Sequence, residues 1–503
     1  MLVENEKNET RPTVVVAEPY SIFDKRQKAL IVFIAATAAT FSGFASNIYF
    51  PSLSTISEDL DVSVELVNLT VTSYLIFQGL APSIWGPLSD AKGRRVTYFC
   101  TFLVFLGACV GLAETPNYAT LIVLRSLQSS GSASTVAVGA AVIGDITTRD
   151  ERGGYMGIFQ GGLLAPVAVG PVIGGALAAS FGWRAVFWFL TIYSGVFLVV
   201  LIVSLPETLR STVGNGSASP TNPIARYPLT LYQRTTKIEF SPQAQPLEAA
   251  KKARIDIAGP IRILFSKQAA PLVIFIAIYY AVWQMSITAV SVLFADFYGL
   301  SETQIGLTFI ANGAGSIIGT LITGKLLDAD YRRIKIKHEA ALSQSGSETE
   351  TEHSRHEDVH FPLETARLRL LPILALLQCA SILTFGWTIQ YRVHIAVPIV
   401  TTFITGWMVV SIVSVTTTYL IDVFPEHKAA SSATVNLARC LLAAGGTSIV
   451  TPIIGAVGVG WTFTITVAAQ LVALLGLAIQ WRYGHRWRVE AANAKSQAAQ
   501  RKE

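Results

Sequence analysis

The chain has 503 residues, of which 51% are apolar and only 14% charged, with a net charge of +5 and a mean hydropathy of +0.48. Soluble proteins carry about 25% charged residues, so a soluble fold of this length would lack the charge to cover its surface. The composition therefore excludes a soluble fold and indicates a polytopic membrane protein.

The N-terminal residues 1–28 are polar and charged, and we expect them to form a tail. The first apolar run starts at Ala29 and is about 22 residues long, enough to cross a ~30 Å hydrocarbon core, so it predicts a retained helix rather than a cleaved signal peptide. The first six predicted spans cover residues 29–50, 66–88, 96–113, 118–144, 154–179 and 184–205. The second six cover residues 271–296, 303–327, 371–390, 395–421, 430–455 and 459–481.

This order predicts an all-α membrane protein of twelve transmembrane helices in two pseudo-symmetric six-helix bundles. The bundles comprise residues 29–205 and 271–481, joined by a linker over 206–270 that is rich in Pro, Ser, Gly and basic residues. We expect a second, partly disordered loop at 328–370 and a tail at 482–503.

Lys and Arg residues are distributed very unequally between the two sets of loops. With the N-terminus in the cytoplasm, 34 of the 38 lie on the cytoplasmic side, and only Arg184 and Arg392 lie outside. Because cytoplasmic loops carry an excess of Lys and Arg, we expect both termini, the linker and the 328–370 loop to face the cytoplasm. Basic residues beside the spans are expected to meet anionic lipid headgroups.

The two halves repeat one another at a constant offset of 238 residues. Ser63, Leu69, Thr70, Gly86, Leu88 and Asp90 match Ser301, Leu307, Thr308, Gly324, Leu326 and Asp328. Such a repeat favours a duplicated unit whose halves rock about a central cavity.

The loop after the second span reads Gly86-Pro-Leu-Ser-Asp90-Ala-Lys-Gly93-Arg94-Arg95. Its glycines permit a tight turn, and Asp90 can pair with nearby cations or cap a helix N-terminus. Such a pairing can hold one conformation and break in another. The spacing resembles the signature loop of the major facilitator superfamily.

Further segments resemble the same family. Leu124-Arg125-Ser-Leu-Gln128 is similar to its buried-arginine motif, and Pro166 with Gly170-Pro171-Val-Ile-Gly174-Gly175 is similar to the Gly-Pro motif of its antiporters. Together with segments such as Pro206-Glu-Thr-Leu, they resemble the fungal twelve-span drug:H⁺ antiporters, in particular the branch of quinidine-resistance-type pumps and citrate exporters. The residues of the Gly-Pro motif suit either plain helix packing or a hinge.

Two arginines are predicted to lie near the middle of the membrane. Arg125 and Arg439 lie inside spans, where an unpaired charge costs at least about 2.5–3.5 kcal/mol, so each must meet an anion, a carbonyl group or water. They are candidate counter-ions for a substrate; the alternative is a structural arginine bonded to helix carbonyl groups. No Asp or Glu lies in the middle of a predicted span, so the cavity suits a carboxylate-bearing or neutral substrate better than a cation.

Because no Asp or Glu lies in the middle of a predicted span, the residue that carries the expected coupling proton is not assigned. Asp90 or Asp145 at the cytoplasmic rim can serve, or the substrate can carry the proton itself. Other candidate cavity residues can hydrogen-bond from within a span, although each also suits a structural role. They are Asn47, Gln128, Tyr279, Trp283, Gln284 and Asn436.

Gly319 to Leu326 nearly spells a phosphate-binding loop, but Leu326 stands where Ser or Thr must bind Mg²⁺, so an ATP-driven pump is rejected. His353, His356 and His360 are best explained as a solvated polar tract. We expect the protein to bind no metal, cofactor or nucleic acid and to have no enzymatic activity. We also expect it to be a monomer. The predicted function is export of an organic acid such as citrate across the plasma membrane. Broad drug or secondary-metabolite efflux is the alternative, followed by a nutrient importer or a transporter-like receptor.

Overall fold

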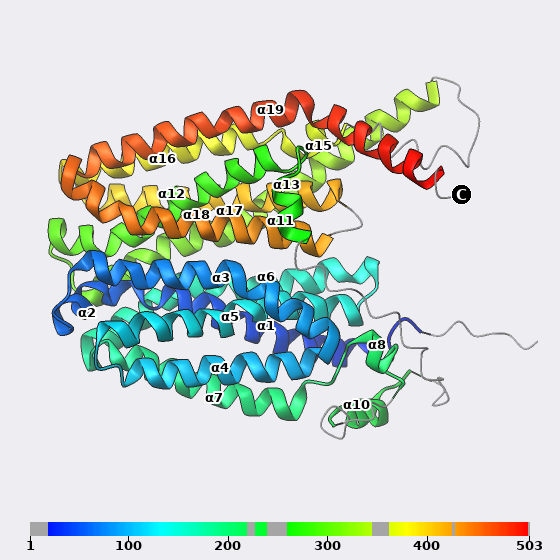
Figure 1. Ribbon diagram of the computed structural model, residues 1–503, viewed down its shortest axis with the longest axis horizontal. Coiled ribbons are helices and arrows are strands. Elements are labelled where there is room, and N and C mark those ends of the chain that lie inside the picture. Colours follow the sequence, from blue (N-terminus) through cyan, green and yellow to red (C-terminus); the bar gives the residue numbers. More distant parts are fainter. Residues whose placement is uncertain (1–18, 219–226, 239–258, 345–361, 425–427, 501–503) are drawn as a thin grey trace, which may run out of the picture.

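The computed structural model describes residues 19–218, 227–238, 259–344, 362–424 and 428–500. Regular structure in these ranges is helical, and twelve long helices lie side by side along the long axis of the molecule (Figure 1). Those of the first half are α1 (Lys25–Asn47), α3 (Val64–Lys92), α4 (Arg94–Ala113), α5 (Tyr118–Ile146), α6 (Arg149–Phe181) and α7 (Arg184–Ser204). Those of the second half are α12 (Ala270–Tyr298), α13 (Glu302–Gln344), α16 (Leu371–Gln390), α17 (Ala396–Val423), α18 (Lys428–Val457) and α19 (Val459–Gln500).

Within the described part of the chain, eleven of these helices are long and apolar enough to cross a membrane. The twelfth, α5, is 29 residues long but carries Arg125, Gln128 and a run of serines that are buried inside the first half. These polar side chains therefore lower the hydropathy of α5 although they lie inside the bundle. The prediction of an all-α membrane protein built from six plus six helices is confirmed.

The two halves form separate bundles that lie one above the other in Figure 1. Both described chain ends lie at one end of these bundles, which we call the terminal end. The opposite end, here called the far end, holds the turn η1 (Phe50–Ser52) and the short helix α2 (Leu53–Asp59), which connect α1 to α3.

Local sequence signals explain where several helices begin and end. Asp24 caps α1 by accepting from the backbone N–H of Gln27, whose side chain accepts from the Asp24 N–H in return. Thr148 and Glu151 form the same reciprocal cap at the start of α6. Between α3 and α4 the chain reverses at Gly93, whose φ of 108° is a conformation open to glycine.

The segments outside the spans contain more helix than the sequence indicated. Helix α13 continues to Gln344, through the first part of the predicted 328–370 loop, and α19 continues to Gln500 through the predicted tail. These extensions are polar, so no apolar period marked them. The described part of the linker contains three short helices, α8 (Arg210–Val213), α10 (Leu229–Thr235) and α11 (Gly259–Leu264), and the described part of the loop contains α15 (Leu363–Leu368). Residues 219–226 and 239–258 of the linker, the three loop histidines and residues 1–18 lie outside the described residues.

The described linker residues pack on the half to which they are nearest in sequence. Gln27 of α1 donates to the backbone oxygen of Tyr232 at 3.0 Å, and the Ile22 N–H donates to Asn215 O at 3.0 Å. Thr434 of α18 donates to Pro260 O at 2.9 Å. The linker therefore extends the N-terminal half up to residue 238, and the C-terminal half from residue 259.

Candidate functional site

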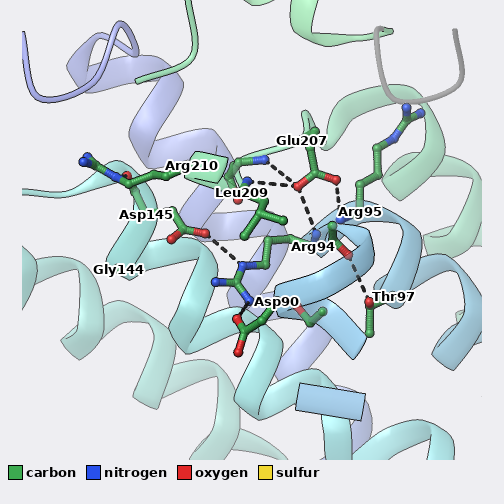
Figure 2. Close-up of polar contacts among 12 residues, drawn as sticks. Asp90, Arg94, Arg95, Thr97, Gly144, Asp145, Glu207, Leu209 and Arg210 are labelled. Carbon is green, nitrogen blue, oxygen red and sulfur yellow. Dashed lines mark hydrogen bonds and ion pairs between the residues drawn. The ribbon is translucent and has the colours of Figure 1, made fainter. Parts of the chain in front are cut away.

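The signature loop forms a compact charged cluster at the terminal end of the first half (Figure 2). The guanidinium of Arg94 pairs with the carboxylate of Asp90, one turn earlier, and its Nε donates to Asp145 Oδ2 at 2.9 Å. Arg94 is buried, so its charge is neutralised by protein rather than by water. The cluster joins α3, α4 and α5, and the expected pairing of Asp90 with a cation is present.

The N-terminus of α4 is capped by Glu207 rather than by Asp90. One carboxylate oxygen of Glu207 accepts from the backbone N–H groups of Arg94, Thr208 and Leu209 at 2.9–3.0 Å, and the other accepts from Arg95 N at 3.3 Å. Glu207 is only 1% exposed. Its charge lies at the positive end of the α4 dipole, and the start of the linker is thereby fastened to the signature loop (Figure 2).

Gly93 is required by this arrangement. A Cβ atom at Gly93 would lie 2.4 Å from Glu207 Oε2, and the positive φ would strain any other residue. Arg210 completes the cluster, because it donates to Asp145 O at 3.0 Å and lies over the ring of Tyr20. Gly86, by contrast, has no atom within 4 Å of where a Cβ would stand.

The second half has an equivalent ion pair at the same end. Arg367 donates to Asp422 Oδ2 at 2.9 Å, which joins α15 to the end of α17 as Arg94 joins α4 to the end of α5. Glu364 is bound by Arg488 of α19 and accepts from the hydroxyl of Tyr419. Both halves therefore carry a buried cluster of charges at the terminal end, and the second was not predicted.

The two halves meet along two seams. In the first, α6 packs on α13 through backbone groups: a Cβ at Gly175 would lie 2.4 Å from Glu302 O, and a Cβ at Gly306 would lie 2.4 Å from Pro171 O. In the second, Asn68 and Thr72 of α3 bond to Thr451 and Thr447 of α18 at 2.8 and 3.1 Å.

The residues of the Gly-Pro motif divide between these contacts. Gly175 and Pro171 face the second half, whereas Gly174 faces α1, where a Cβ would lie 2.1 Å from Ile48 O. Pro166 packs against Gly43, and Gly170 packs more loosely near Asn47. All of them serve close helix packing, and Pro171 and Gly175 do so where the halves touch.

Arg125 is enclosed within the first half. It is 1% exposed, with Nη1 donating to Ala45 O at 3.1 Å and to Gln128 Oε1 at 2.5 Å. Its guanidinium carbon lies 4.2 Å from the ring centroid of Tyr49 and 4.5 Å from that of Tyr74. Two aromatic faces and two oxygens therefore hold this charge, as expected for a buried cation without a carboxylate. Its Nε has no partner among the described residues.

Arg439 is more open. It is partly exposed, and its guanidinium carbon lies 4.7 Å from the ring centroid of Tyr280 on α12. Its Nη2 donates to Asn436 Oδ1 at 2.9 Å, and the amide of Asn436 in turn donates at 3.1 Å to the backbone oxygen of Gln78, in the other half. Within the described part of the chain, no carboxylate pairs with Arg439.

The other predicted cavity residues are scattered. Asn47 bonds within its own helix, and Gln128 is buried beside Arg125. Tyr279 is buried, with its hydroxyl 3.4 Å from Cys379 Sγ. Trp283 donates to Asn312 Oδ1 at 3.1 Å and lines a small pocket between α12, α13 and α17. Gln284 lies one turn after Tyr280, and no described residue bonds to its side-chain amide.

Comparison with known proteins agrees with this architecture. The sequence model of the Major Facilitator Superfamily matches residues 35–340, more than half of the chain. The chain is 37% identical over 471 residues to Citrate exporter 1 of Aspergillus niger, an alignment covering 93% of this chain and 88% of that one. It is 36% identical over 451 residues to the multidrug transporter QDR2 of Candida glabrata, covering 87% and 77%.

Two solved structures share the fold at low sequence identity. The human organic anion transporter MFSD10 matches with a TM-score of 0.55 and 15% identity, covering 90% of this chain and 99% of that one. The xylose transporter XylE of E. coli, in a partially occluded inward-open conformation, matches with a TM-score of 0.57 and 14% identity, covering 91% and 99%. The chain therefore belongs to the Major Facilitator Superfamily and is a membrane transporter, not an enzyme.

Proposed function

We propose that this transporter exports a small organic anion, with citrate or another carboxylate metabolite as first choice, across the plasma membrane by proton-driven alternating access. Both termini are then cytoplasmic, and the far end faces outward. The observation that carries the proposal is Arg439: a partly exposed guanidinium that donates to one amide oxygen, that of Asn436, and has no carboxylate partner among the described residues. A carboxylate substrate fits it, because Arg binds carboxylates in a bidentate geometry.

Tyr280 and Gln284 add to this site from α12. The ring of Tyr280 supports one face of the Arg439 guanidinium, so the N–H groups at its edge, two of which donate to Asn436 Oδ1, stay available to polar partners. Gln284 lies on the same side of α12, one turn further on, and offers an amide for a carboxylate or hydroxyl oxygen.

Arg125 takes a different part in the proposal. Its enclosure by Tyr49 and Tyr74 and its bond to Gln128 favour a role in holding α1, α3 and α5 together. Direct contact of Arg125 with a substrate would require the tyrosine rings to move apart.

Asn436 links substrate binding to the contact between the halves. Its oxygen accepts from Arg439 and its nitrogen donates to Gln78 of the other half. A carboxylate bound to Arg439 competes for the same N–H groups, so it weakens the link to α3. Binding is thereby coupled to the opening of one seam, which alternating access needs.

Similarity to relatives supports export of this kind. One relative is named a citrate exporter and another a multidrug transporter. The second candidate function is therefore efflux of drugs or secondary metabolites. The aromatic side chains of Tyr280 and Trp283 and the small pocket lined by Trp283 favour it.

Transport into proteoliposomes distinguishes organic-anion export from efflux of drugs or secondary metabolites. We expect wild-type protein to transport labelled citrate faster with an imposed proton gradient, and Arg439→Gln to lose this flux while quinidine flux remains. Arg392→Gln, which removes an exposed arginine at the far end, is the matched control and should keep both activities. Citrate flux unchanged in Arg439→Gln rejects the proposal, and quinidine flux alone in the wild type supports the second candidate. If the wild type transports neither citrate nor quinidine, the remaining functions are import of another solute and reception of a signal.

A further inference from the structure

The far end is closed by contacts between η1 and α2 of the first half and α13 of the second. The rings of Phe50 and Phe309 are stacked with centroids 6.0 Å apart. Beside them, the hydroxyl of Thr55 donates to the carboxylate of Glu302. Glu302 is partly buried, and its backbone oxygen lies against Gly175 of α6. It is thus a carboxylate placed directly at the junction of the two halves.

The carboxylate of Glu302 has no cationic partner among the described residues. The charged group that acts on it is Glu58 of α2, which has the same sign. Asp59 of α2 is already paired with Arg184, and Asp296 of α12 is exposed. Within the described elements around it, α6 carries no charged residue after Arg152, and η1 carries none.

Closing the far end therefore disfavours the ionised form of Glu302. It brings the carboxylate out of water and toward Glu58 on the opposite half, and both changes favour the neutral acid. The N-terminus of α13 favours the ionised form, but it accompanies Glu302 in the open and the closed states and cancels from the difference. A neutral carboxyl group still hydrogen-bonds to Thr55, because it can donate as well as accept.

We propose that Glu302 and Thr55 form a proton-operated latch, in which protonation of Glu302 favours the closed far end. The latch needs only the alternating access that the proposed function also assumes, and it does not depend on the substrate. The sign follows from linkage: the closed state holds the proton more tightly, so a falling pH shifts the population toward closure. One proton changes the closed-to-open ratio by at most about tenfold per pH unit.

The test measures the distance between spin labels at the far end, without substrate. Pro116 in the first half and Val393 in the second are exposed there and are replaced by cysteine for labelling, with Cys100→Ser to remove a partly exposed thiol. The full chain is placed in lipid nanodiscs and titrated between about pH 4 and pH 8, where a perturbed carboxyl group titrates. We expect the fraction with the short distance to rise as the pH falls.

Three variants of the labelled protein complete the design. Glu302→Gln, which keeps the shape and the bond to Thr55, should stay closed and lose the pH dependence. Glu65→Gln is the matched control, since Glu65 is also a first-turn glutamate at this end but is exposed, and it should keep the wild-type dependence. Thr55→Val should lower the closed fraction at acidic pH.

The latch is rejected if the wild-type distances do not respond to pH, or if Glu302→Gln titrates as the wild type does. A closed fraction in Thr55→Val equal to that of the wild type at acidic pH also rejects it. Because the measurement uses no substrate, these outcomes are independent of whether citrate is transported.

Discussion

Among the residues at the terminal end of the first half, Glu207 is the one whose carboxylate should contribute most to stability. It accepts hydrogen bonds from four backbone N–H groups, two at the start of α4 and two of the linker residues that follow Glu207, while almost fully buried. In Glu207→Gln the amide oxygen can keep the three bonds to Arg94, Thr208 and Leu209, but as neutral bonds, which costs about 1 kcal/mol each. Its nitrogen then faces the Arg95 N–H, a second donor, which costs about 1 kcal/mol more.

The loss of negative charge at the α4 N-terminus adds about 0.3–1 kcal/mol. We therefore expect Glu207→Gln to lower the free energy of unfolding by about 4–5 kcal/mol. The assay is reversible unfolding of the purified protein in mixed micelles, followed by tryptophan fluorescence.

The control for this prediction is Glu65→Gln, an exposed first-turn glutamate of α3, which should change stability by less than about 0.5 kcal/mol. If Glu207→Gln differs from the wild type by no more than this control does, the capping role assigned to Glu207 is refuted.

Three further predictions concern packing inside the first half and between the halves. Gly93→Ala should lose at least about 1–3 kcal/mol in the same assay, because its φ is open only to glycine, and adding Glu207→Ala should relieve its steric part. Gly175→Ala should destabilise the closed far end relative to the open one by about 1–3 kcal/mol, which the spin-label distances report as a larger open fraction. Gly174→Ala should lower the free energy of unfolding by a similar amount without changing the spin-label distances. Arg125→Lys should lower stability by about 1–3 kcal/mol, since Lys cannot stack between two tyrosine rings, and should leave citrate affinity nearly unchanged.

Much of the fold could be predicted because the membrane imposes a length on each apolar run. The span that begins at Tyr118 illustrates how far this holds, since length identified it even though its serines and Arg125 reduce its hydropathy. The polar continuations to Gln344 and Gln500 could not be predicted in the same way. A helix in water that is held by ion pairs such as Arg488 with Glu364 carries no apolar period.

The candidate site was predicted less completely, because its residues come together only through tertiary contacts. The sequence predicted that Arg125 and Arg439 lie within long helices, but the enclosure of one and the openness of the other depend on Tyr49, Tyr74 and Tyr280, which other segments contribute. Gly174 contacts the end of α1 and Gly175 contacts α13, and this difference likewise depends on which helices pack against α6.

Two functional candidates were missed for the same reason. Glu207 was visible in the sequence only as part of Pro206-Glu-Thr-Leu, a segment noted for its resemblance. Its role needs the fold to bring the end of α7 to the start of α4. Glu302 lay at the edge of a predicted span, and only the approach of α2 distinguishes it from an ordinary first-turn acid.

Direct binding of citrate to the purified protein tests whether Arg439 is a counter-ion for a carboxylate substrate. Loss of a hydrogen-bonded charge pair is worth about 1.5–3 kcal/mol, so Arg439→Gln should weaken binding about 10- to 150-fold, whereas Arg392→Gln should leave it unchanged. Equal citrate affinity in Arg439→Gln and in the wild type, measured by titration calorimetry at one salt concentration, would contradict the account.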